Sequence, residues 1–102
     1  MNRIFVANRS EMLEGRPKKV RVGKIDVTVF FHKERFYAFK DLCPHAGHSL
    51  SSGRIFDDKL VCPGHNWHFE LESGQCVKGD TSIVLKSFKT VVEDGKVFVE
   101  VE

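Results

Sequence analysis

Cys43-Pro44-His45 and, after sixteen intervening residues, Cys62-Pro63-Gly64-His65 are two short segments that each offer one thiolate and one imidazole. The 102-residue chain has only three cysteines and five histidines, and two of each fall in these segments. Thiolates and imidazoles are common ligands of transition metals in proteins. We therefore interpret the two segments as one metal site whose candidate ligands are these two cysteines and two histidines.

The order of the ligands distinguishes between two kinds of metal site. Zinc sites made from two cysteines and two histidines usually place the cysteines close together in sequence and the histidines close together. Here each segment carries a mixed pair, which suits a two-iron cluster. Cys43 and Cys62 would then bind one iron while His45 and His65 bind the other. A zinc site remains the alternative.

The residues around the ligands extend the pattern. The first segment continues as Ala46-Gly47-His48-Ser49-Leu50, and the second as Asn66-Trp67-His68-Phe69-Glu70-Leu71, followed by Ser73-Gly74. With these neighbours and this spacing the chain resembles Rieske proteins. The resemblance implies one Rieske-type [2Fe-2S] cluster with two cysteine and two histidine ligands. Its neutral imidazoles raise the reduction potential above that of an all-cysteine cluster.

Short segments rich in valine, isoleucine and phenylalanine alternate with turn residues, which is typical of an antiparallel all-β protein. Predicted strands lie at residues 2–7, 19–22, 25–31, 35–40, 53–56, 60–62, 68–71, 84–92 and 96–101, with one short helical turn at 10–14. Gly23-Lys24 and Asp94-Gly95 are predicted to form tight hairpin turns, because these residues tolerate positive φ.

The Rieske resemblance also implies how these strands are organised. An antiparallel β sandwich or barrel base would comprise residues 1–42 and 79–102. A cluster-binding subdomain of about residues 43–78 would be inserted into this base, so that residues 1–102 form a single Rieske domain.

Several positions differ from those of respiratory-type Rieske proteins, which have high potentials. Those proteins carry a disulfide between the two loops, and a serine and a tyrosine that hydrogen-bond the cluster. The matching positions here are His48, Gly64, Trp67 and Phe69. We therefore predict a low-potential, ferredoxin-like centre. Many Rieske domains also cover the cluster with a proline-bearing third loop; the matching residues 77–81 lack proline, and Gly79 is the candidate to shape this loop instead.

Charge and hydropathy limit the other function classes. The net charge is +2, and the basic residues are interspersed with acidic ones, so we expect neither nucleic-acid nor membrane binding. No apolar run is long enough to cross a bilayer and no signal peptide is recognisable, so we expect a soluble, cytoplasmic protein. Cys76 is left as a single thiol, predicted to be a partly buried small residue, which fits a reducing compartment. His32 is predicted to be a solvated turn residue.

No part of the chain outside the region that resembles Rieske proteins is left to bind a substrate, a flavin or a mononuclear iron. We therefore predict an electron-transfer protein, not an enzyme: a soluble ferredoxin that carries one electron from a reductase to a terminal oxygenase or other oxidoreductase. It would be a monomer unless it is part of a complex. Asn66-Trp67, Leu71 and Ser73-Gly74 are also similar to small subunits of NAD(P)H nitrite reductases, which implies a reductase subunit as the alternative. A zinc-stabilised binding module is a third hypothesis.

Overall fold

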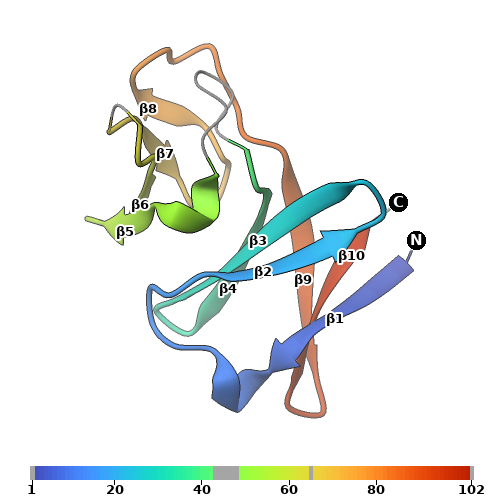
Figure 1. Cartoon of the computed structure of the whole chain (residues 1–102). Coiled ribbons are helices and arrows are strands. Elements are labelled where there is room, and N and C mark those ends of the chain that lie inside the picture. Colours follow the sequence, from blue (N-terminus) through green and yellow to red (C-terminus); the bar gives the residue numbers. More distant parts are fainter. Residues whose placement is uncertain (1, 43–48, 65, 102) are drawn as a thin grey trace.

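The computed structural model describes residues 2–42, 49–64 and 66–101 (Figure 1), and these residues form two antiparallel β-sheets. The strands of the larger sheet are β1 (Asn2–Asn8), β2 (Lys18–Val22), β3 (Ile25–His32), β4 (Arg35–Lys40), β9 (Ser87–Glu93) and β10 (Lys96–Val101). The strands of the smaller sheet are β5 (Arg54–Phe56), β6 (Lys59–Val61), β7 (His68–Glu70) and β8 (Cys76–Lys78). The prediction of an all-β fold is confirmed.

The larger sheet has the strand order β1-β10-β9-β4-β3-β2 and curls into a near-barrel. The smaller sheet has the simple order β5-β6-β7-β8, so each of its strands pairs with the next one along the chain. All four of its strands come from the chain between β4 and β9, as an inserted unit (Figure 1). No helix in the described part of the chain is long and apolar enough to span a membrane.

Two hydrophobic cores share strands β3 and β4. Val27 and Val29 of β3 and Ala38 of β4 belong to the core inside the larger sheet, which valines of β10 complete. Phe30 and Phe39 belong to a second core that contains the buried side chains of the smaller sheet. Because successive side chains of a strand point to opposite faces, these two strands can serve both cores at once.

The hairpins of the larger sheet and of β5–β6 turn through residues with positive φ. Gly23 and Asp94-Gly95 adopt this conformation, as predicted. In the β3–β4 and β5–β6 turns, however, the positive-φ residues are Lys33-Glu34 and Asp57-Asp58, none of which is glycine. A non-glycine residue is strained in this region, so the flanking strand pairing must hold these two turns in place.

Some local predictions were wrong. The helical turn predicted at residues 10–14 is a 3-10 helix at Arg9–Glu11 instead, and the Glu11 carboxylate accepts a hydrogen bond from the Asn8 N–H at 2.9 Å. A second 3-10 helix lies at Leu50–Ser52. Strand β8 was not predicted, because Val77 is its only residue that strongly favours strands. The strand predicted to begin at residue 84 begins at Ser87.

A polar bridge joins the end of β3 to the β5–β6 turn of the smaller sheet. The His32 side chain is only 15% exposed, and its Nδ1 lies 2.8 Å from Glu14 Oε2 while its Nε2 lies 2.7 Å from Asp58 Oδ1. Asp58 also pairs with Lys33, whose Nζ is 2.8 Å from the same oxygen. The prediction of a solvated turn residue at His32 was therefore wrong: its partners come from segments 18 and 26 residues away, which sequence patterns do not bring together.

Asp58→Asn tests this bridge through its pH dependence. Hydrogen bonds from Lys33 and His32 lower the pKa of Asp58 from 3.8 to about 2. A carboxyl with a depressed pKa stabilises the fold above its unfolded-state pKa, and this contribution disappears as the pH falls from about 4 to about 2. The variant should therefore have a lower urea midpoint than wild type at neutral pH, and the two midpoints should converge below pH 4. Asp57→Asn in the same turn is the control, and a difference that persists unchanged at pH 2 would contradict this account.

Candidate metal centre

Of the four predicted ligands, the structure describes Cys62. Cys43, His45 and His65 lie outside the described residues, so the ligand assignment as a whole stays a prediction. The geometry of the site is therefore that of Cys62 and of the segments that flank the other three residues.

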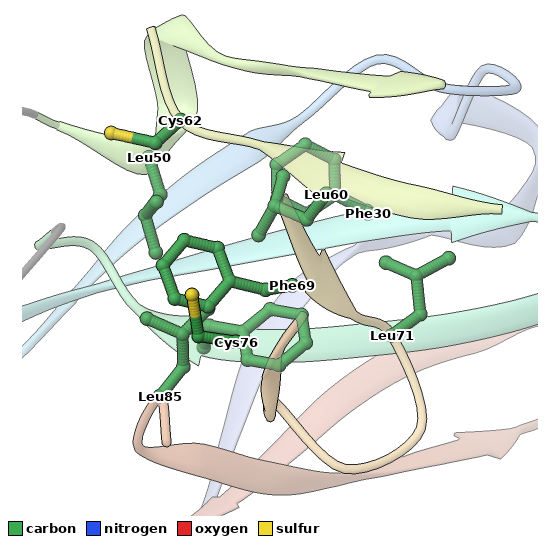
Figure 2. Packing of buried hydrophobic residues seen from close by; sticks show 9 residues of the cluster. Phe30, Leu50, Leu60, Cys62, Phe69, Leu71, Cys76 and Leu85 are labelled. Carbon is green, nitrogen blue, oxygen red and sulfur yellow. The ribbon is translucent and has the colours of Figure 1, made fainter. Parts of the chain in front are cut away.

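Cys62 directly follows strand β6 and is completely buried. Its N–H donates a hydrogen bond to the Trp67 carbonyl at 2.9 Å, which closes the turn between β6 and β7. Its side chain lies in the same apolar core as Leu50 and Phe69 (Figure 2). The thiol is buried and is not part of a disulfide, so its sulfur is free to act as the ligand that the sequence predicts.

Gly53 brings the chain that follows the first ligand segment against the second. It follows the 3-10 helix at Leu50–Ser52, and its N–H donates to the Leu50 carbonyl at 2.9 Å. A Cβ atom on Gly53 would clash with the Val61 carbonyl oxygen and lie 3.4 Å from Pro63 Cδ. Only glycine permits this approach, which places Leu50–Gly53 directly beside the residues on either side of Cys62.

Gly79 shapes the third segment, where no proline is present. Its φ of +127° is one that side chains rarely adopt, and a Cβ atom there would clash with the indole ring of Trp67. The Trp67 ring therefore lies flat against the backbone that follows β8 and is itself packed on the core that contains Cys62. The prediction that glycine shapes this segment agrees with this geometry.

Asp41, two residues before the predicted ligand Cys43, was not predicted from the sequence. Its side chain is 1% exposed although it carries a charge. Burial acts to raise the pKa of this carboxyl, but hydrogen bonds from Ser49 and Ser51 outweigh it and hold the pKa below its usual value. The only sequence signal for this contact was the position of Asp41 just before the first ligand segment and of Ser49 and Ser51 just after it.

Cys76 shares the core with Cys62 but has a different environment. It is 1% exposed, so the prediction of a partly buried residue underestimated its burial. Its Sγ lies 3.4 Å from the Lys78 carbonyl oxygen, and burial raises the pKa of the thiol. A thiol with a raised pKa is a poor nucleophile and a poor candidate for redox chemistry.

Comparison with known proteins identifies the family. A model of the Rieske [2Fe-2S] domain matches residues 2–89. The chain belongs to the Rieske [2Fe-2S] family. Membership in this family implies one Rieske cluster, so the predictions of the fold and of the cofactor are both confirmed.

Two relatives place the chain near ferredoxins. This chain is 33% identical over 93 residues to the ferredoxin component of an alkene monooxygenase system from Xanthobacter autotrophicus. The aligned region covers 90% of this chain and 75% of that protein. It is 31% identical over 102 residues to the ferredoxin subunit of 3-phenylpropionate/cinnamic acid dioxygenase from Photorhabdus laumondii, with 99% and 96% coverage. These relatives confirm the prediction of a ferredoxin-type electron carrier.

Solved structures agree with this placement. A chain in the complex of reduced oxygenase and oxidized ferredoxin in carbazole 1,9a-dioxygenase superposes with a TM-score of 0.88 at 30% identity, covering 98% of this chain and 97% of that one. A protein described as an NADH-dependent nitrite reductase small subunit from Mycobacterium tuberculosis gives a TM-score of 0.90 at 19% identity, with 99% and 96% coverage. The second likeness shows the shared fold and no more.

The described residues fit a Rieske cluster. Cys62 supplies a buried sulfur that no disulfide occupies. Gly53 allows the chain at residues 50–53 to approach Val61 and Pro63 on either side of Cys62, and the Trp67 ring lies against Gly79. The donor set of the family, two thiolates and two imidazoles, is present in the sequence as Cys43, Cys62, His45 and His65.

Gly79→Ala tests the contact between the third segment and Trp67. A side chain at this position must both adopt a disfavoured φ and displace the indole ring, so the variant should lose about 1–3 kcal/mol of stability. Its tryptophan emission should shift to longer wavelength, because Trp67 is the only tryptophan and would be pushed toward water.

Gly23→Ala is the matched control. Gly23 also has a positive φ, +62°, but a Cβ atom there meets nothing within 4 Å. Urea unfolding should show a smaller loss for this variant, with unchanged emission. Equal losses for the two variants, with the same emission spectrum, would show that the contact with Trp67 is unimportant.

Proposed function

We propose that this chain is the ferredoxin component of a multicomponent oxygenase, which accepts one electron from a reductase and passes it to the terminal oxygenase. The observation that carries the proposal is the sequence identity with ferredoxin components, and the buried, free thiol of Cys62 supports it. Two relatives with more than 30% identity are ferredoxin components of oxygenase systems, which supports the same partners for this chain.

We assign the cluster ligands as Cys43 and Cys62 on one iron and His45 and His65 on the other. When bound, such a cluster supplies one-electron redox chemistry with a potential between roughly −150 and +300 mV. The residues of the chain would position the ligands and exclude water from them. Leu50 and Phe69 are fully buried around Cys62, which shields its sulfur, and the N–H of Cys62 fixes the turn toward Trp67.

The whole chain is proposed to act as one Rieske domain in the cytoplasm. The base of residues 1–42 and 79–102 is supported by the strands of the larger sheet, and the cluster-binding subdomain of about residues 43–78 by those of the smaller sheet. A reducing compartment suits a chain whose described cysteines, Cys62 and Cys76, are both free. A monomer that meets its partners transiently is consistent with a carrier.

The small subunit of a nitrite reductase is the second candidate function. It is supported by the resemblance of Asn66-Trp67, Leu71 and Ser73-Gly74 to such subunits. The ferredoxin is preferred, because two ferredoxin components are 33% and 31% identical to this chain over 90% and 99% of its length. Reconstitution separates the two: with the reductase and oxygenase of a three-component aromatic dioxygenase, substrate-dependent NADH oxidation should require this chain. Stable co-purification with a nitrite reductase large subunit, without such activity, would favour the second candidate.

Cys62→Ser and Cys76→Ser test the ligand assignment as a matched pair. Both cysteines are buried in the same core, so the two substitutions change packing to a similar extent. Cys62→Ser should abolish the red-brown colour, the bound iron and sulfide, and the EPR signal of the dithionite-reduced protein, because it removes a thiolate ligand. Cys76→Ser should retain all three. If Cys62→Ser keeps a wild-type spectrum, the assignment of this ligand is wrong.

The reduction potential tests the prediction of a ferredoxin-like centre. His48, Gly64, Trp67 and Phe69 stand where high-potential Rieske proteins have a disulfide and two hydrogen-bonding side chains. Hydrogen bonds to the sulfurs of a cluster raise its potential, so their loss should leave a low value. A spectroscopic redox titration should give a midpoint below about +100 mV, well short of the upper end of the family range. A higher value would exclude a low-potential relay.

A further inference from the structure

The Asp41 carboxylate connects the two ends of the first ligand segment. Asp41 follows β4 and precedes Cys43 by two residues, while Ser49 and Ser51 lie beyond the segment. Ser49 Oγ donates to Asp41 Oδ2 at 2.6 Å, and the Ser51 N–H donates to Oδ1 at 2.7 Å. Ser51 Oγ donates to Oδ2 at 3.1 Å, so both carboxylate oxygens are occupied. One side chain thus closes a loop of eight to ten residues.

The negative charge of Asp41 is buried, and its ion pair with Lys19 compensates it only in part. The side chain is 1% exposed, and its cationic neighbour Lys19 is at a distance of 3.7 Å, longer than a direct hydrogen bond. Lys19 is also shared, because its Nζ lies 3.7 Å from Asp26 Oδ2, a carboxylate that is one-third exposed. A buried charge acts over a longer range than an exposed one, since water and salt screen it less.

We propose that Asp41 is a positioning residue for the cluster: its carboxylate closes the first ligand segment through Ser49 and Ser51, and its buried negative charge lowers the reduction potential. This inference rests on the proposed ligand assignment, in which Cys43 and His45 lie inside the closed segment. Reduction adds one negative charge to the site, and a fixed negative charge nearby opposes it. The loop closure should also slow the loss of iron, because a ligand held at both ends of its segment departs less readily.

Asp41→Asn and Asp26→Asn form a matched pair, because each removes one carboxylate that lies 3.7 Å from Lys19. Only Asp41 also holds the serines. In the holoprotein, Asp41→Asn should release iron to a chelator about tenfold faster than wild type. Its midpoint potential should rise by up to about 59 mV, which corresponds to a tenfold change in the equilibrium constant of a one-electron reduction. Asp26→Asn should match wild type in both measurements.

Ser51 provides a readout that does not depend on the cluster. Its amide should exchange with solvent about tenfold faster in Asp41→Asn than in wild type, because it loses the charged acceptor, and should be unchanged in Asp26→Asn. Should Asp41→Asn fail to fold, Ser51→Ala keeps the charge and the backbone hydrogen bond. It should show faster iron release with a midpoint close to wild type.

The proposed function and the positioning role of Asp41 can fail independently of each other. If wild type binds no cluster, the proposed function fails, whereas the amide exchange of Ser51 still tests the loop closure. If wild type binds the cluster but Asp41→Asn and Asp26→Asn agree in iron release, midpoint and Ser51 exchange, the positioning role of Asp41 is wrong.

Discussion

Strands β3 and β4 are buried on both faces, and the arrangement of the rest of the molecule depends on this. Val27 and Val29 fill the core of the larger sheet, while Phe30 and Phe39 pack against the smaller sheet. Each such side chain contributes roughly 1.5–3 kcal/mol when it is fully buried. The strands of the smaller sheet have only three residues each, which is too short for independent stability. Their position therefore depends on the aromatic face that the larger sheet presents to them.

This dependence explains why a small protein can hold a metal centre without disulfides in the described part of the chain. Cys62 is anchored because β6 and β7 are pinned by Leu60 and Phe69, both fully buried in the shared core. The first ligand segment begins just after β4, so one of its ends is fixed by the larger sheet. The two halves of the site therefore come from different sheets, and the packing of Phe30 and Phe39 between those sheets sets their relative position.

Sequence patterns identified the features that are local. The ligand spacing led to the family, and alternating apolar residues located most strands within one or two positions. Asp94-Gly95 predicted its own turn, because glycine tolerates positive φ. Interactions between distant segments were not predictable in the same way. The contacts of His32 with Glu14 and Asp58, and the buried charge of Asp41, depend on which loops the fold brings together, and isolated polar residues give no periodic signal. Strand β8 was missed for a related reason, since Cys76 pairs with Phe69 across a turn that shows no strand pattern.

Three segments around the predicted site are held by three different kinds of contact, and each contact starts from a residue directly adjacent to a strand. A buried carboxylate closes the segment after β4, a backbone hydrogen bond from Cys62 closes the turn after β6, and an indole ring against Gly79 holds the chain after β8. Each kind of contact matches the number of residues that it bridges. The backbone bond reaches only five residues, whereas the carboxylate with its two acceptor atoms can hold two separate serines across a longer loop. The ring needs no polar partner from Gly79, only a residue without a side chain. The contacts that hold the ends of these segments therefore use other residues than the predicted ligands, with the single exception of the Cys62 backbone.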